Sequence, residues 1–289
     1  MAKFCHIAPI PHLDLVEGAK VHLLLAHLVE QSKDYVSFYR KEKANASTLI
    51  LDNSAFEMYK QGRPMYPIDN LIEMAEEVCA DYVVMSDYPN QVGSVTIKAA
   101  ESLAPKLKKK GFGTFFCPQS LIGDKQDLFE GFEWAAESDL VDYIGVSILA
   151  IPNAYGVEKG NKLQRFISRY MFMQELYNEG ILDKIKQNGK NIHMLGMLDG
   201  PGEIRLMAPF KDYIDTWDSS AAIWLGLHAG RQFDDSPTGL IDGKYEVEVD
   251  FNYSNERNVL SAVINQSIIN NYISMYLMRE EDSEKLQIW

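Results

Sequence analysis

The sequence has few cysteines and no long apolar run. Cys5, Cys79 and Cys117 lie far apart, and there is no Cys-x-x-Cys or Cys/His cluster. Scattered cysteines in an odd number argue against a disulfide framework and against a structural zinc site. No window reaches the roughly 18 consecutive apolar residues of a membrane span, and the N-terminal segment lacks the apolar stretch of a signal peptide. We therefore expect a cytoplasmic protein without a structural zinc site.

The chain also lacks an excess of positive charge, because its formal net charge is −13. Proteins that grip long duplex nucleic acid usually carry a basic surface. The acidic balance lowers that expectation but leaves room for a local basic groove. Positive charge is concentrated in 106–110 and at Arg165 and Arg169. For the lysines of 106–110, the plainer interpretation is a solvated helix end.

Short apolar runs alternate with longer helical patterns along the whole chain. Strand, helix and strand repeat about eight times, which predicts a parallel sheet with helical crossovers and matches a single (β/α)8 TIM barrel spanning 1–289. The alternative, a doubly wound open sheet, usually has a glycine-rich turn after its first strand, and none is present here. The predicted strands are 4–10, 47–52, 81–87, 113–119, 142–148, 191–197, 213–219 and, more weakly, 244–251.

Helices are predicted between these strands, and the last of them is long. The segment 230–250 is rich in glycine and aspartate, so we expect a loop or small insertion over the barrel mouth. The predicted helices are 17–32, 68–80, 94–110, 124–138, 161–188, 201–210 and 255–279.

Polar residues close several of the predicted strands. The active site of such a barrel lies at the carboxyl ends of its strands, so these side chains should point into one mouth. Three carboxylates around one pocket suit nucleophilic and acid/base chemistry at a sugar anomeric carbon, or Mg²⁺ binding, and the spacing does not select between them. The strand-end residues are His6, Asp52, Asp87, Gln119, Ser147 and Asp218.

Other interpretations stay open for several of these polar residues. Each of the three aspartates could instead organise a turn or cap a helix. We expect Asp215 to have a structural partner, and His193 to be a core residue with satisfied hydrogen bonds. His22 and His27 are expected to be ordinary helix residues, because their spacing does not place them on one helix face.

The order of these strand ends resembles the tRNA-guanine transglycosylases, (β/α)8 barrels that exchange guanine for a 7-deazaguanine. The resemblance spans about 45–232. Its segments are LDNSAFE, similar to the family's DSGGFQ; VVMSDYP, similar to the turn of its base-reading aspartate; FFCPQSL, similar to VQG; GVSILAIPNAYG, similar to GGLAVGE; MLGMLDGPGEI, similar to LMGVGTP; and YIDTWDSSAAIW, similar to GIDMFDCVLPTR.

This resemblance implies roles for individual residues. Asp218 would be the nucleophile, Asp52 the general acid/base and Asp87 the reader of the guanine edge. Phe56 would stack on the base, opposite Leu195. Other contacts to the base would come from Asn53, Ser54, Gln119, Gly145, Ser147 and Gly196, and the candidates for holding a nucleic acid are Lys108, Lys109, Arg165 and Arg231.

The departures from the family pattern bear on the substrate. The family's double glycine is Ser54-Ala55 here, and no cysteine after Cys117 could form the family's zinc site. Because that zinc supports the part of the fold that meets tRNA, the chain looks more like the viral relatives that insert deazaguanines into DNA. The resemblance then implies a nucleic-acid substrate, DNA more than tRNA, in the host cytoplasm, a 7-deazaguanine as second substrate, and no cofactor.

Two other functions stay open at this point. One is a metal-dependent barrel hydrolase or lyase acting on a small sugar or nucleotide, and the other is a non-catalytic partner subunit related to the transglycosylases. The sequence also leaves open the deazaguanine that is inserted, the sequence context, and the oligomeric state, a homodimer included.

Overall fold

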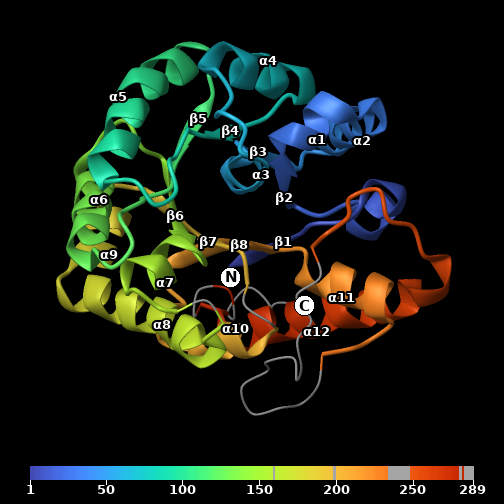
Figure 1. Cartoon of the computed structure of the whole chain (residues 1–289). Coiled ribbons are helices and arrows are strands. Elements are labelled where there is room, and N and C mark those ends of the chain that lie inside the picture. Colours follow the sequence, from blue (N-terminus) through green and yellow to red (C-terminus); the bar gives the residue numbers. More distant parts are fainter. Residues whose placement is uncertain (159, 198–199, 234–247, 280–281, 283–289) are drawn as a thin grey trace.

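A computed structural model describes residues 1–158, 160–197, 200–233, 248–279 and 282 (Figure 1). Its eight strands are parallel, and each pairs with its neighbour in the order β1-β8-β7-β6-β5-β4-β3-β2. β1 and β2 stand at the two ends of this order and contact one another, so the sheet curls into a nearly closed barrel. This is the predicted (β/α)8 architecture. The strands are β1 (Lys3–His6), β2 (Val21–Leu25), β3 (Thr48–Asp52), β4 (Tyr82–Val84), β5 (Gly113–Phe116), β6 (Tyr143–Ser147), β7 (Asn191–Leu195) and β8 (Ile214–Ser219).

Helices surround the strands on the outside of the barrel (Figure 1). Among the described residues, no helix combines the length and the apolarity that crossing a bilayer requires. The last helix, α12, is the predicted long final helix, and it packs along α11 and reaches β1. The helices are α1 (Ala26–Gln31), α2 (Lys33–Ala44), α3 (Ala55–Gln61), α4 (Ile68–Val78), α5 (Gly93–Lys109), α6 (Lys125–Glu137), α7 (Ala150–Ala154), α8 (Lys162–Asn178), α9 (Ile181–Gln187), α10 (Gly202–Leu206), α11 (Ala221–Ala229) and α12 (Val259–Tyr276), with 3-10 turns η1 (Ile10–Val16), η2 (Ala208–Phe210) and η3 (Glu256–Asn258).

The second strand corrects the prediction of a helix over 17–32. Val21–Leu25 is a strand that is buried at every position, and α1 begins directly after it. Periodicity cannot separate a short continuous apolar run in a strand from the buried part of a helix. His22 therefore lies on a strand, and His27 lies on α1.

Two further predicted elements differ from the structure. The weak strand over 244–251 falls partly on 244–247, which lie outside the described residues, and 248–251 form no strand. The predicted helix over 161–188 is two helices, α8 and α9. Gly180 separates them, and it adopts a left-handed conformation with φ of 71° that favours glycine.

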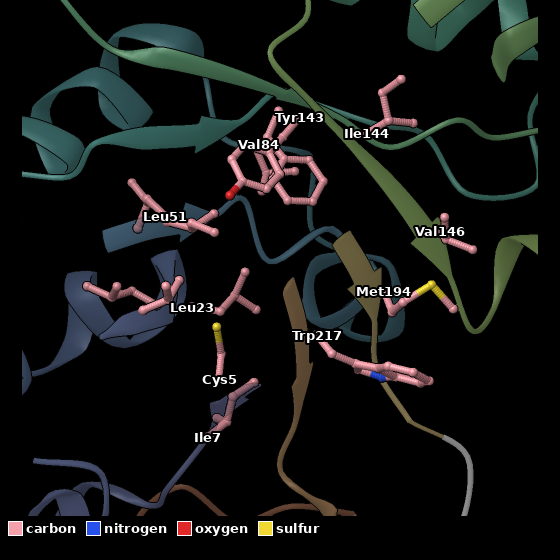
Figure 2. Close-up of a cluster of buried hydrophobic side chains, with 14 of the residues drawn as sticks. Cys5, Ile7, Leu23, Leu51, Val84, Tyr143, Ile144, Val146, Met194 and Trp217 are labelled. Atoms are coloured by element: carbon pink, nitrogen blue, oxygen red, sulfur yellow. The ribbon is translucent and has the colours of Figure 1, made fainter. Parts of the chain in front are cut away.

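Buried apolar side chains from strands all around the barrel form its core (Figure 2). Trp217, on β8, is fully buried and is among the largest of these side chains. Because close-packed interiors resist displacement, the strands hold the residues at their carboxyl ends in fixed positions. The labelled members of the cluster are Cys5, Ile7, Leu23, Leu51, Val84, Tyr143, Ile144, Val146, Met194 and Trp217.

A repeated ion pair fastens the amino ends of the strands. An aspartate lies at the amino end of each of β4, β6 and β8. Its carboxylate accepts a backbone N–H, at 2.8 Å, from the strand that comes before it in the sequence. The same carboxylate binds a lysine on the helix that precedes this earlier strand. Each pair therefore ties two strands and a helix together. The three sets are Asp81 with Leu49 and Lys43, Asp142 with Thr114 and Lys108, and Asp215 with Ile192 and Lys186.

Two of the residues predicted to contact nucleic acid lie at the end of the barrel opposite the mouth. Lys108 binds Asp142 at 3.1 Å, and Lys109 is the last residue of α5, which a short turn connects to the start of β5. Both lysines thus lie at the amino ends of the strands. The structure does not bring them to the carboxyl ends, where the site was expected.

Asp215 has the structural partners that the sequence predicts for it. Besides Lys186 at 2.5 Å and the Ile192 N–H, its carboxylate accepts from Arg279 at 2.9 Å. We expect Asp215→Ala to lower the free energy of unfolding by about 2 kcal/mol, because a charge-assisted network is lost from a partly buried site. Urea denaturation measures this effect. Asp212→Ala, at an exposed neighbouring position, is the control, and equal loss in both variants would contradict the anchoring role.

Candidate active site

A pocket of about 630 Å³ opens at the carboxyl ends of the strands, a size typical of small-molecule sites. The structure brings most of the predicted site residues together around it. Ser54 and Gly145 were also predicted to contact a ligand, but neither is among the described residues that line the pocket. The predicted residues that line the pocket are Asp52, Asn53, Phe56, Asp87, Gln119, Ser147, Leu195, Gly196 and Asp218.

The turn after β3 positions Asp52. Ser54 adopts a left-handed conformation with φ of 57°, and its N–H donates to the Asp52 carboxylate at 2.6 Å. The Ser54 hydroxyl contacts His27 Nδ1 at 2.9 Å and accepts from the His27 N–H. Burial lowers the pKa of His27 to about 4, so its ring is neutral at pH 7. These bonds hold a serine in a conformation that usually favours glycine, and so fix the carboxylate at the strand end.

Asp87 is buried and held between two amides. Asn53 Nδ2 donates to one carboxylate oxygen at 2.8 Å, and Gln119 Nε2 donates to the other at 2.5 Å. Burial raises the pKa of Asp87 to about 6, although these hydrogen bonds oppose the shift. Asn53 also donates to the Met85 carbonyl at 2.7 Å. Strands β3, β4 and β5 thus converge on one oriented carboxylate.

Asp218 is the residue before the last of β8, and its two oxygens have different surroundings. Oδ1 lies 2.9 Å from His193 Nε2 and accepts the Gly196 N–H at 3.0 Å. Oδ2 has no hydrogen-bond donor among the described residues. Because Asp218 lines the pocket, the structure combines one restrained oxygen with one oxygen that is free to react.

His193 is a core residue, as predicted, but sequence reasoning missed its place beside Asp218. Its side chain is fully buried on β7, and its Nδ1 lies 2.7 Å from the Thr216 hydroxyl. The alternation of strand side chains carries the missed signal. Leu195 is expected to face the pocket, so the residue two positions earlier faces the same way.

Arg169 fixes the turn that follows β7. It is fully buried, and its Nη1 donates to the carbonyls of Leu195 and Gly196, both at 3.0 Å. Its Nε lies 3.2 Å from a carboxylate oxygen of Glu203, and its guanidinium lies 5.3 Å from the Trp217 ring. The Trp217 indole N–H also donates to the Gly196 carbonyl at 2.8 Å. This framework sets the Gly196 N–H that binds Asp218.

The remaining predicted residues have mixed placements. Phe56 lies at the pocket rim, and Lys60 Nζ lies 4.8 Å from its ring centroid. The Ser147 hydroxyl accepts the N–H groups of Leu149 and Ala150, so it caps the next turn. A side chain at Gly145 would come within 2.8 Å of Leu195 and Phe115, which explains a glycine under the pocket floor.

Three predicted positions are not part of the pocket. His6 does not point into the mouth, since its Nε2 contacts Asn270 Oδ1 on α12 at 3.2 Å. Arg165, on α8, and Arg231, after α11, are not among the described residues that line the cavity. Much of the predicted loop over the mouth, 230–250, falls on 234–247, outside the described residues. Its described end does line the cavity, at Glu248 and Val249.

Comparisons with known proteins bear on the fold. No protein-family model and no curated protein sequence matches this chain. A solved structure of a HpcH/HpaI aldolase/citrate lyase family protein from Burkholderia cenocepacia is similar, with 13% identity, 80% of this chain and 91% of that chain covered, and a TM-score of 0.50. This chain is a TIM barrel. At this identity the likeness extends to the fold alone.

Two other similar barrels have lower TM-scores. Active domain 2 of a chitinase from Pyrococcus furiosus has 10% identity and a TM-score of 0.48, with 96% of each chain covered. The tryptophan synthase α subunit from Legionella pneumophila has 13% identity and a TM-score of 0.46, with 93% of this chain and 91% of that chain covered. The resemblance to the transglycosylases is not tested by these likenesses and stays a prediction.

Glu57 is a further pocket residue of the TIM barrel that sequence reasoning missed. It is half-buried on α3 and lines the same cavity as Asp52. Burial raises the pKa of Asp52 well above its ordinary value, and the charge of Glu57 adds to that shift, with smaller additions from Asp87 and Asp218. An acidic residue in the first turn of a helix is commonplace, so the sequence carried no signal for it.

The described residues contain no group of three or more His, Cys, Asp or Glu side chains placed to hold one metal ion. The acids around the pocket instead interact with protein donors and with one another. Their arrangement can present a carboxylate nucleophile, a protonated carboxyl group and an oriented hydrogen-bond acceptor to a single ligand.

Proposed function

We propose that this protein is a base-exchange transglycosylase. It would replace guanine in a nucleic acid, DNA rather than tRNA, with a 7-deazaguanine through a covalent aspartyl–sugar ester. The observation that carries the proposal is the unequal environment of the Asp218 oxygens, inside a pocket that also holds Asp52 and Asp87. A carboxylate is an effective nucleophile at an anomeric carbon, where positive charge develops as the base leaves.

In the first half-reaction, Oδ2 of Asp218 attacks C1′ of the nucleotide. The bond between C1′ and N9 breaks, and its electron pair goes to the guanine. Asp52 supplies the proton that neutralises the departing base. Burial and the neighbouring acids raise the pKa of Asp52, which suits a group that must begin the reaction protonated.

The second half-reaction reverses these steps with a different base. The deazaguanine gives its N9 proton to the Asp52 carboxylate, and N9 attacks C1′. The bond between C1′ and Oδ2 breaks, and its electron pair returns to Asp218. Asp52 is protonated again, so protons and electrons balance over the cycle without a cofactor.

Asp87 would read the base. A guanine-like edge presents N1–H and N2–H₂, both donors, and the ionised Asp87 carboxylate can accept from both. Asn53 and Gln119 hold this carboxylate in one orientation. A site built on such hydrogen bonds discriminates strongly against bases that lack the donors.

We expect the affinity for guanine to fall as pH decreases through about 6. Burial raises the pKa of Asp87 to about 6, so the accepting carboxylate predominates above this pH and the neutral acid below it. About tenfold weaker binding is expected at pH 5 than at pH 7.5, since one pKa unit corresponds to a tenfold change in ionisation. Equilibrium dialysis with labelled guanine measures the effect, and equal affinity at the two pH values would contradict the assignment.

The substrate polymer is inferred from the access that C1′ requires and from the cysteine content of the chain. To reach C1′ the enzyme needs a nucleotide that is single-stranded or flipped out of the stack. DNA is favoured over tRNA because the sequence lacks the cysteines of the family's zinc site. Arg165 and Arg231 stay candidate contacts for the polymer outside the pocket.

Incubation with radiolabelled guanine tests the proposal. Single-stranded DNA, duplex DNA, tRNA and free nucleosides would be offered separately, each with and without EDTA. Label entering single-stranded or duplex DNA, insensitive to EDTA, is the expected result. Label entering only tRNA or nucleosides would revise the substrate. No label in any acceptor would overturn the proposal, and EDTA-sensitive hydrolysis of a sugar or nucleotide would favour a metal-dependent hydrolase.

A further inference from the structure

A row of hydrogen-bonding side chains runs through the barrel interior to Asp218. His193 Nε2 lies 2.9 Å from Asp218 Oδ1, and His193 Nδ1 lies 2.7 Å from the Thr216 hydroxyl. His193 is fully buried, so solvent does not compete for either ring nitrogen.

We infer that His193 is a positioning residue that selects the attacking oxygen of Asp218 and stabilises the Asp218 carboxylate when it departs from the sugar. This inference rests on the proposed function. The proposed reaction requires only that Asp218 attack C1′. The structure adds which oxygen attacks, and which side chain makes the carboxylate a good leaving group in the second half-reaction.

The proton on the imidazole can be placed from its partners. An ionised carboxylate only accepts hydrogen bonds, so the hydrogen between His193 and Asp218 belongs to Nε2. In the neutral ring Nδ1 then accepts the Thr216 hydroxyl hydrogen. Every donor in the row thus points toward Asp218.

The same geometry assigns roles to the two oxygens. His193 and the Gly196 N–H both donate to Oδ1, which leaves the lone pairs of Oδ2 for C1′. In the ester, Oδ2 is bonded to the sugar and Oδ1 is the carbonyl oxygen. When the ester breaks, negative charge returns to the carboxylate. Donors aimed at Oδ1 stabilise this charge more than they stabilise the neutral ester, so they favour release.

His193→Met tests this role, because it keeps a buried side chain of similar size and removes the donor. We expect turnover to fall about a hundredfold, as when one preorganised donor is removed from other active sites. The KM for the incoming base should change little, since His193 does not line the pocket. The fraction of enzyme trapped as the covalent adduct should rise, because release becomes slower than capture.

His193→Gln is the matched variant, because its side-chain amide can again donate to Oδ1, and it should recover most of the lost turnover. Unchanged turnover in His193→Met would overturn the inference. So would an adduct fraction that falls in parallel with turnover, or equal losses in the Met and Gln variants, because those are the results of a purely structural role.

Nitrogen-15 NMR of histidine-labelled wild-type protein tests the inference without any activity. The resonances of His193 are assigned by their absence from the spectrum of His193→Gln. A protonated Nε2 at pH 7 is expected, and an unprotonated Nε2 would overturn the inference even if base exchange is observed. If Nε2 is protonated but no acceptor ever takes up guanine, the proposed reaction fails while the placement of this hydrogen stands.

Discussion

Asp218→Asn is expected to abolish base exchange and the covalent adduct, with a loss of about ten-thousand-fold or more, as for other nucleophile replacements. The asparagine oxygen can still accept from His193 and Gly196, so the geometry of the strand end should be kept. Only the reactive oxygen is replaced, by an amide nitrogen that cannot form the ester. Exchange of labelled guanine measures turnover, and denaturing electrophoresis with labelled nucleic acid measures the adduct.

The control for this variant is Glu133→Gln, on the exposed face of α6. It changes the charge by the same amount far from the mouth and should retain wild-type activity. Thermal unfolding should be similar for both variants, because neither leaves a buried donor without an acceptor. Adduct formation by Asp218→Asn would move the nucleophile to another pocket acid, with Asp52 the first candidate.

The convergence of Asp52, Asp87 and Asp218 was predictable because each aspartate closes an apolar run. In a parallel barrel, the carboxyl ends of all strands meet at one mouth, so the order of strand ends was enough to group residues far apart in the chain. Every strand except β2 overlaps a predicted one. For β2, the run VHLLL continues directly into α1 without a turn residue, so no boundary separates the strand from the helix.

The residues that the sequence did not reveal act through neighbours on other strands. His193 matters because β7 and β8 pair in a register, with a shift beside Ile192, that sets His193 opposite Thr216 and next to Asp218. Arg169 reaches the turn after β7 from a helix that precedes that strand. Glu57 enters the pocket only because α3 begins at the mouth. Residue type and spacing do not determine such contacts between elements.

The buried guanidinium of Arg169 leads to the second large effect. Arg169→Met is expected to lower the free energy of unfolding by about 3 kcal/mol or more, because breaking one side of a buried ion pair leaves a charge and two carbonyls without this donor. The affected groups are Glu203 and the carbonyls of Leu195 and Gly196. Urea denaturation measures the loss. Base exchange should also decrease, because this turn carries the N–H that binds Asp218.

Arg165→Met is the matched control, one helical turn earlier on α8, where the arginine is only half-buried. It should change stability by less than about 1 kcal/mol. If Arg165 contacts the nucleic acid, this variant should also weaken nucleic-acid binding. The salt dependence of binding should then decrease by the amount expected for the loss of about one phosphate contact.

The double variant Arg169→Met/Glu203→Met removes both charges and should recover part of the lost stability, since a buried pair replaced as a whole costs less than a pair broken on one side. No recovery would mean that Arg169 acts through the carbonyls of the turn and not through Glu203. Equal urea midpoints for the two single variants would show that the buried arginine does not hold the β7 turn at all.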